Sequence, residues 1–253
     1  MRNQITYLGH ATVLCEIDGV RLLTDPLLRE RAFYLRRRVE LVKVTAYQNI
    51  DLVLISHLHL DHLDIASLRL LGLNTRLIVP VGAAKLLQKK GFTQVCEMQP
   101  GDALEHGSLS IEATHAEHHS RYPPTGLTTP ALGFLIRGSH RVYFPGDTDI
   151  FPGMADLEEN LDVALLPIWG WGPNLGPGHM NPHRAAEALT LLHPRHAIPI
   201  HWGTFYPRGL DWFKPPMLTE PPQIFLAQAT RLAPQVQVHI LTPGDSLGLP
   251  REA

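Results

Sequence analysis

His57-Leu58-His59-Leu60-Asp61-His62 places three imidazoles and one carboxylate in six consecutive positions. It directly follows residues 51–56, an apolar run that predicts a buried strand. Imidazole nitrogen and carboxylate oxygen are ligands that zinc, manganese and iron accept. A histidine-rich surface loop is the alternative, but four potential ligands at the end of one strand favour a bound divalent ion.

The spacing within this segment predicts positions for two metal ions. In an extended chain, alternate side chains point to the same side, so His57 and His59 can hold one ion together. Asp61 and His62 come where the chain turns toward a helix expected over residues 65–71. The turn directs these two side chains to a different place, which leaves room for a second ion.

Composition and charge are those of an ordinary globular protein. The chain has 253 residues, of which 44% are hydrophobic, and a net charge of −2. This length suits one domain made of two packed halves, approximately residues 1–125 and 126–253. The balanced charge gives no general attraction to nucleic acid or to an anionic membrane. The sequence has neither a signal peptide pattern nor a membrane-spanning run, so we expect a cytoplasmic protein.

The local patterns predict sheets packed together with helices outside. Asp18-Gly19 is a turn signal between the apolar runs 11–17 and 20–24, which predicts a hairpin. Further strands are predicted over residues 76–79, 108–113, 131–137, 141–144, 162–166 and 197–200. Helices are predicted over residues 65–71, 82–90, 182–192 and 222–232. Asp64 fits the N-cap of the first helix and Gly72 its end. Cys15 and Cys96 are expected to be buried thiols and not a disulfide.

Two ions need more ligands than residues 57–62 offer, and later strand ends supply them. Asp147 follows a predicted strand and a glycine, and its carboxylate can bridge two cations. His201 ends another apolar strand. Three histidines between residues 114 and 121 compete for the remaining position, and their place after the preceding strand does not choose among them: His115, His118 and His119.

On these residues the chain resembles the metallo-β-lactamase superfamily of hydrolases, whose His-x-His-x-Asp-His pattern matches residues 57–62. Within it, the chain is most similar to the branch of ascorbate-6-phosphate lactonase and N-acylphosphatidylethanolamine-hydrolysing phospholipase D. The narrower resemblance rests on Leu8-Gly9-His10-Ala11-Thr12, Thr24-Asp25-Pro26, Pro145-Gly146-Asp147-Thr148 and Ile200-His201-Trp202-Gly203-Thr204-Phe205. It implies an α/β (α+β) fold in the form of a four-layer αββα sandwich.

The resemblance also implies a set of metal ligands, with Asp147 bridging the two ions. The implied ligands are His57, His59, Asp61, His62, His118, Asp147 and His201. His118 is selected because the branch typically reads Ala-Gln/Glu-His-Trp/His-Ser here, which makes His115 and His119 neighbouring pocket residues. Asp25 matches an aspartate that supports the ligands, since a metal-bound imidazole needs an acceptor for its other ring N–H. His10 is expected beside it.

A dinuclear centre of this kind implies a metal-dependent hydrolase. Zinc is the metal expected first, with manganese and iron as alternatives, and a hydroxide bridging two ions would attack an ester-type bond. Asp61 and Asp147 would act in catalysis. His179 matches a family histidine near the reacting group and can donate a proton, although packing within its loop is an alternative role. We expect a small anionic substrate containing a phosphodiester or a lactone. The alternatives are an RNA nuclease and a non-catalytic metal-bound binding module.

Two segments are candidates for contact with the substrate. Arg36 and Arg37 belong to a basic, aromatic stretch over residues 29–38 and can bind an anion, although a solvated surface loop is the alternative. Trp169 and Trp171 belong to a loop that is expected to form another wall, and His119 is a third candidate. A small-molecule substrate is the expected partner. No membrane or nucleic-acid partner is expected, and a homo-oligomer is left open.

Overall fold

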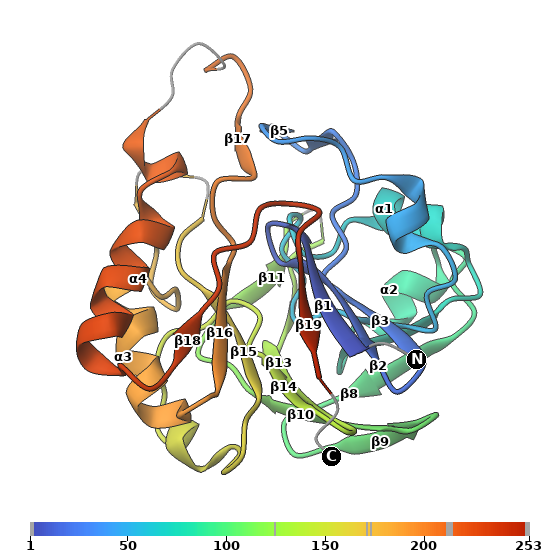
Figure 1. Cartoon of the computed structure of the whole chain (residues 1–253). Coiled ribbons are helices and arrows are strands. Elements are labelled where there is room, and N and C mark those ends of the chain that lie inside the picture. The colour runs from blue at the N-terminus through green and yellow to red at the C-terminus, as the bar shows by residue number, and fades with distance from the viewer. Residues whose placement is uncertain (1–2, 124, 171, 173, 211–214, 251–253) are drawn as a thin grey trace.

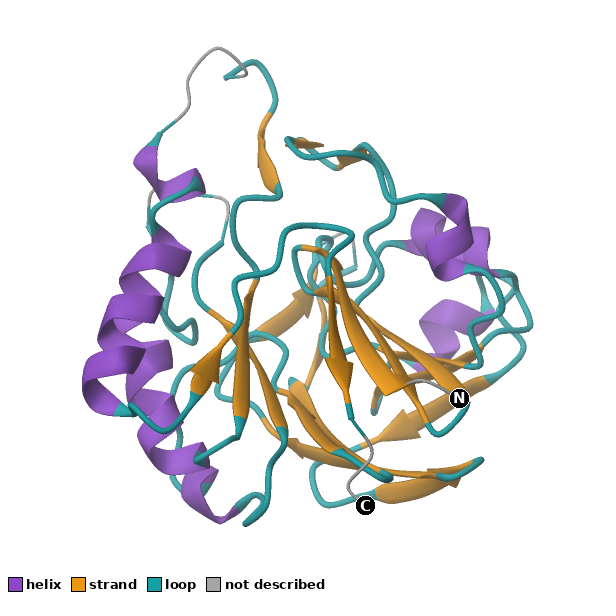
Figure 2. Ribbon diagram, in the orientation of Figure 1, coloured by secondary structure: helices purple, strands orange, loops and turns teal. Residues whose placement is uncertain are grey.

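The computed structural model describes residues 3–250 except 124, 171, 173 and 211–214. Two large β-sheets pack face to face, and a pair of helices covers the outer face of each (Figure 1, Figure 2). One pair is α1 Ile65–Leu71 and α2 Ala84–Gln88, and the other is α3 Pro182–Leu192 and α4 Pro221–Leu232. This arrangement confirms the predicted αββα sandwich.

The first sheet has seven strands in the order β19-β1-β2-β3-β6-β7-β8. They are β1 Asn3–Gly9, β2 Thr12–Ile17, β3 Val20–Thr24, β6 Leu52–Leu54, β7 Arg76–Pro80, β8 Val95–Met98 and β19 Ser246–Leu249. The predicted Asp18-Gly19 turn joins the antiparallel strands β2 and β3, and both of its residues have positive φ. Strands β3, β6, β7 and β8 run parallel.

The second sheet also has seven strands, in the order β18-β16-β15-β14-β13-β10-β9. They are β9 Ala103–His106, β10 Leu109–His115, β13 Leu132–Arg137, β14 Arg141–Phe144, β15 Val163–Pro167, β16 His196–Ile200 and β18 Gln237–Val238. Strands β14, β15, β16 and β18 run parallel. The chain enters this sheet between Met98 and Ala103, ahead of the division near residue 125 that the sequence suggested.

Two smaller sheets and three short 3₁₀ helices complete the structure. β11 Ser120–Tyr122 pairs with β12 Leu127–Thr129. The three-stranded sheet consists of β4 Arg31–Ala32, β5 Leu35–Arg37 and β17 Phe205–Pro207. Strands β5 and β17 stand beyond the ends of the large sheets, at the top of Figure 1. The 3₁₀ helices are η1 Val44–Tyr47, η2 Met154–Asp156 and η3 Pro216–Leu218.

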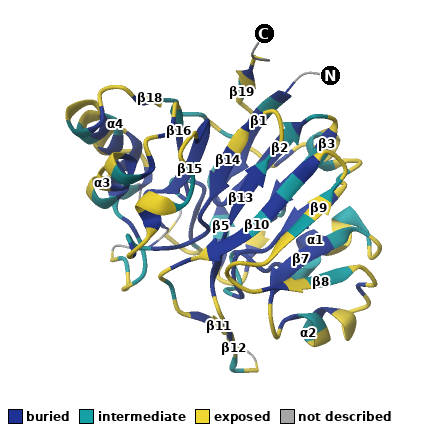
Figure 3. Cartoon of the chain, turned by 90° about the horizontal axis from the view of Figure 1, so that it is seen from below, coloured by how far each residue is buried: buried dark blue, intermediate teal, exposed yellow. Residues whose placement is uncertain are grey.

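Central strands are buried on both faces, which explains their continuous apolar sequences. In β15, Val163 and Leu165 pack between the two sheets, whereas Ala164 and Leu166 pack with side chains of α3 and α4. All four are fully buried. Figure 3 shows this burial along the middle strands, with exposed positions concentrated at sheet edges and helix surfaces. The buried apolar area stabilises the sandwich by about 25 cal/mol per Å².

The capping residues predicted for α1 lie at its two ends in the structure. Asp64 accepts a hydrogen bond from Ser67 N (2.9 Å) at the start of α1, and Gly72 ends it with φ +108°. The helix predicted over residues 82–90 is shorter, and Glu97 Oε1 accepts from the N–H of Ala84 at its start (2.7 Å), since the N-cap residue Ala83 has no polar side chain.

The cysteines differ in burial. Cys15 is buried and free as expected, but Cys96 is only half-buried, because β8 is the last strand of its sheet. In the part of the chain that the structure describes, no helix is long and apolar enough to cross a membrane.

Candidate metal centre

The predicted ligands all lie just beyond the ends of strands at one edge of the sandwich. They follow β6, β10, β14 and β16, whose carboxyl ends are neighbours. The residues are His57, His59, Asp61, His62, His118, Asp147 and His201. Strand direction therefore explains how segments more than a hundred residues apart meet in one site.

Three histidines form a first donor cluster. His57 Nε2 lies 3.0 Å from His59 Nδ1, and His118 Nε2 lies 3.1 Å from the same His59 atom. One nitrogen from each ring falls within 4.8 Å of the others. Such close approach of ring nitrogens places several lone pairs around one point, where a divalent cation fits.

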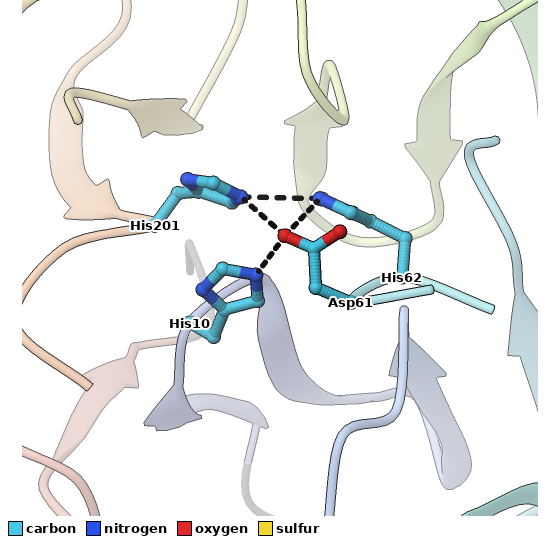
Figure 4. A group of neighbouring side chains, drawn as sticks. All are labelled: His10, Asp61, His62 and His201. Carbon is cyan, nitrogen blue, oxygen red and sulfur yellow. Dashed lines mark hydrogen bonds and ion pairs between the residues drawn. The ribbon is translucent and has the colours of Figure 1, made fainter. Parts of the chain in front are cut away.

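A second cluster combines one carboxylate with three histidines (Figure 4). His62 Nε2 lies 3.1 Å from His201 Nε2, and Asp61 Oδ2 lies 3.8 Å from the former and 3.9 Å from the latter. His10 Nε2 is 3.1 Å from the same carboxylate oxygen. His10 therefore lies at the edge of this cluster, in hydrogen-bond contact with the Asp61 carboxylate.

Asp147 lies between the two clusters. Its Oδ2 is 3.2 Å from His62 Nε2, and its Oδ1 is 3.4 Å from His201 Nε2. It also forms a possible ligand group with His118 and His179. Oδ1 is buried and accepts no hydrogen bond from the described residues. A buried carboxylate oxygen without a donor is costly, and a cation satisfies it.

In three of the clustered histidines, the ring nitrogen that faces away from the cluster donates a hydrogen bond to an oxygen of the protein. His62 Nδ1 donates to Asp25 Oδ2 (2.7 Å), His201 Nδ1 to the Trp169 carbonyl (2.7 Å), and His118 Nδ1 to the Gly178 carbonyl (2.9 Å). These bonds fix the tautomer, so that Nε2 carries a lone pair toward the centre, as metal ligation requires.

Ser56 extends this support, and no sequence pattern indicated this role. Its hydroxyl donates to Asp25 and lies 3.0 Å from His57 Nδ1, so it can accept from that ring. Its backbone N–H donates to Asp25 Oδ1 (2.7 Å). Asp25 thus lies fully buried behind both clusters, in the supporting position that the resemblance implied.

The electrostatics separate neutral rings from charged carboxylates. Burial lowers the pKa of His57 well below its usual value and the pKa of His118 to about 4, so both rings are neutral near pH 7. Burial opposes ionisation of Asp61 and Asp147, but nearby His62 and other histidines hold the pKa of both carboxyls well below the usual range. In contrast, burial disfavours a charged His62 ring, but Asp147 and Asp61 outweigh this and raise the pKa of His62 well above its usual value. The neutral rings of His57 and His118 and the ionised carboxylates are donors suited to a divalent cation.

The other two histidines of the middle segment lie outside the clusters. His115 is exposed, with Nε2 3.4 Å from Glu117 and its ring against Phe151. His119 is exposed and is not among the described residues that line the cavity over the metal ligands, so the expected substrate contact is not seen. Only the ring of His118, of these three, joins His57 and His59.

A cavity of about 380 Å³ opens over the clusters. Its described lining comprises Ala32, Phe33, Tyr34, Leu35, His59, Leu60, Asp61, Pro123, Asp147, Gly170, Gly172, Asn174, Leu175, Gly176, His179 and His201. His179 Nε2 is 3.4 Å from Asp147 Oδ2. Burial disfavours a charged His179 ring, but the bond to Asp147 outweighs this and raises the pKa of His179.

The expected substrate residues have different places. Arg37 is buried and donates to the carbonyls of Leu8 (3.2 Å) and Leu27 (2.6 Å), so its predicted contact with substrate is wrong. Arg36 does not line the metal cavity and pairs with Glu30 (3.2 Å).

Of the two tryptophans expected to wall the site, Trp169 contributes its backbone carbonyl to His201, while the neighbouring Gly170 lines the cavity. Trp171 lies outside the described residues.

Comparison with known proteins gives the same fold and class. Igni18, a metallo hydrolase of Ignicoccus hospitalis, superimposes with a TM-score of 0.77 at 25% identity, with full coverage of both chains. A metal-dependent hydrolase of Methanopyrus kandleri is 34% identical over 96% of this chain and 98% of its own length. The N-acyl-phosphatidylethanolamine-hydrolyzing phospholipase D 1 of Caenorhabditis elegans is 33% identical over 81% of this chain.

That last match spans 64% of the length of the phospholipase, so the chain corresponds to under two thirds of it. The family model described as the beta-lactamase superfamily domain matches residues 20–202, which include every donor of the two clusters except His10. The chain therefore belongs to the metallo-β-lactamase superfamily.

Proposed function

We propose that this protein is a dinuclear hydrolase that cleaves an ester-type bond, a phosphodiester or a lactone, in a small substrate. The observation that supports it most is the place of Asp147, whose carboxylate lies close to His62 and His201 of one ligand set (3.2 and 3.4 Å) and forms a donor group with His118 of the other. A carboxylate in that position can serve two cations at once.

The residues divide into two ligand sets around this carboxylate. His57, His59 and His118 would hold one ion, and Asp61, His62 and His201 the other, with zinc as the metal expected first. Divalent ions held here would supply an activated water and would polarise the oxygen of the bond to be cut.

His179 is the residue best placed to move a proton. It lines the cavity, and its Nδ1 donates to the Gly176 carbonyl (3.1 Å), which fixes the ring with Nε2 toward Asp147. A proton on Nε2 can pass to the leaving oxygen of a substrate in the cavity. Asp147 orients that nitrogen.

The size of the cavity and the named relatives support the substrate class. A volume of about 380 Å³ accommodates a small molecule. The Caenorhabditis elegans relative is named as a phospholipase D, which supports a phosphodiester, and the Methanopyrus kandleri relative is named only as a metal-dependent hydrolase.

A metal-resolved activity screen tests the proposal. Protein reconstituted with zinc, manganese or iron would be assayed on bis(4-nitrophenyl) phosphate, on several lactones and on RNA, with metal content measured in parallel. Hydrolysis of a phosphodiester or a lactone that requires metal supports the proposal. Cleavage of RNA alone would favour the nuclease, and fully loaded but inactive protein would favour a non-catalytic module.

A further inference from the structure

The three-stranded sheet β4-β5-β17 has one apolar face and one basic face. Arg31 lies directly opposite Arg36, and Arg36 lies opposite Tyr206, so these side chains share a face. Arg208 follows two positions after Tyr206, and its N–H bonds to the Tyr34 carbonyl (2.9 Å), which continues the pairing. Strand alternation thus brings three arginines together.

The opposite face of the sheet is packed and takes no part in this cluster. Ala32, Leu35 and Phe205 are buried there in a small apolar group with Leu27. The guanidinium of Arg37 lies 4.9 Å from the centre of the Phe205 ring. The apolar face fixes the sheet, so the arginines extend from a rigid base.

The basic face borders a hollow of about 500 Å³. Its described lining is Arg31, Tyr34, Arg36, Arg208 and Gly209, with no acidic side chain among them. Tyr34 also lines the cavity over the metal ligands, so the two spaces meet at its ring. Tyr34 thus borders both spaces, which places the arginines next to the cavity over the metal ligands.

Arg31 and Arg36 lie directly opposite each other in the sheet, which concentrates positive charge on this face. Glu30 pairs with Arg36 at 3.2 Å, but both side chains are largely exposed, and such pairs exchange readily with other anions. Arginine forks match the oxygens of a phosphate in a bidentate manner.

We propose that the basic face formed by Arg31, Arg36 and Arg208 binds a phosphate group of the substrate, at a distance from the bond that is cut. The substrate class is then a phosphorylated small molecule whose ester-type bond lies over Asp147 while its phosphate lies beyond Tyr34. This assignment of substrate class rests on the proposed function, whereas binding of a phosphate at the basic face does not.

Calorimetric titration of the metal-loaded protein with phenyl phosphate tests the binding site without turnover. The combined Arg31→Gln, Arg36→Gln and Arg208→Gln substitutions should raise the Kd about tenfold or more, as expected for lost charge-assisted hydrogen bonds. The matched control combines Arg69→Gln, Lys90→Gln and Arg231→Gln, which remove the same charge from exposed positions elsewhere. Equal Kd values for the two triple variants would overturn the proposal.

Two further variants keep the test decisive if the triple variant folds poorly. Arg208→Gln alone, beyond the end of β17, should still raise the Kd severalfold. Glu30→Gln should lower it, because Arg36 then loses a competing carboxylate. Weaker binding in Glu30→Gln together with unchanged binding in Arg208→Gln would contradict the site.

Turnover tests the link between the basic face and the metal centre. The ratio of kcat/KM for a phosphorylated lactone to that for its unphosphorylated counterpart should fall about tenfold in the arginine triple variant and stay constant in the control. An unchanged ratio would separate the basic face from the substrate. If wild-type protein hydrolyses neither lactone nor bis(4-nitrophenyl) phosphate, the proposed function fails, while the calorimetry still decides the binding site.

The phosphate can belong to a soluble molecule or to a lipid headgroup. Co-sedimentation with phosphatidylcholine vesicles that contain phosphatidic acid, set against the titration with phenyl phosphate, separates these sources. Arginine-dependent binding in either arm supports the site and identifies its source. Binding in neither arm overturns it.

Discussion

The His62 Nδ1–H donates to Asp25 Oδ2 over 2.7 Å, and both side chains are completely buried. This bond turns His62 Nε2 toward Asp61, Asp147 and His201. The orientation of His62 Nε2 toward the other donors of its cluster therefore depends on Asp25, which lies on the far side of the His62 ring.

Asp25→Asn should weaken metal binding without removing a ligand. The substitution keeps the shape but replaces the carboxyl acceptor of His62 Nδ1–H by an amide, and loss of such support typically costs about 10- to 100-fold in affinity. Competition with a chelator measures the change. Asp51→Asn is the control, because Asp51 accepts only a surface hydrogen bond from Arg21 N (2.9 Å). Equal affinities in both variants would contradict the supporting role.

Asp147→Asn should reduce the bound metal from two equivalents to about one and abolish hydrolysis, because an amide oxygen bridges two cations poorly. Elemental analysis of the purified, reconstituted protein measures this. The neighbouring Asp149→Asn is a matched control, since Asp149 pairs with Arg184 (2.8 Å) and not with the clusters. Two equivalents retained in Asp147→Asn would rule out the bridging arrangement.

Substitution of the three middle histidines tests which one is a ligand. His118→Ala should empty the first cluster and lose nearly all activity, because His118 Nε2 lies 3.1 Å from His59 Nδ1. His115→Ala and His119→Ala should keep most of the metal, since both side chains are exposed. Metal loss in His115→Ala alone would mean that His115, and not His118, is the ligand from this segment.

His179→Gln should lower kcat by about 100-fold or more while the metal content stays intact, if the ring donates a proton and does not bind an ion. Metal analysis beside steady-state kinetics separates the two roles. His183→Gln is the control, because His183 is exposed on α3. Loss of metal in His179→Gln would make His179 a ligand, a role that its place beside His118 and Asp147 also allows.

The sequence predicted the strand ends well because ligands there follow apolar runs that are buried on both faces. Asp147 and His201 could be found in this way, since His201 directly follows such a run and Asp147 follows one after Pro145-Gly146. His118 could not be chosen from spacing, because its position depends on the loop after β10 and on the Gly178 carbonyl (2.9 Å), which lies sixty residues further along the chain.

The sequence also could not show which of Arg36 and Arg37 is exposed. Arg36 and Arg37 are neighbours in the sequence, but strand alternation puts one on the exposed face and the other on the buried face of β5. Which face is buried depends on the pairing of β5 with β17, far along the chain. The three-residue strand has too short a pattern to reveal that choice.

Arg37→Ala should destabilise the fold by about 2–4 kcal/mol, because it leaves two buried carbonyls without a donor and removes the cation from the Phe205 ring. The backbone is adapted to this side chain, since a Cβ on Gly9 would lie 2.9 Å from Arg37 Nη1. Urea unfolding of the metal-free protein measures the change. Arg31→Ala, at an exposed position of the same sheet, should change stability by less than about 0.5 kcal/mol. If the free energy of unfolding falls equally little in Arg37→Ala, the buried guanidinium does not stabilise the sheet.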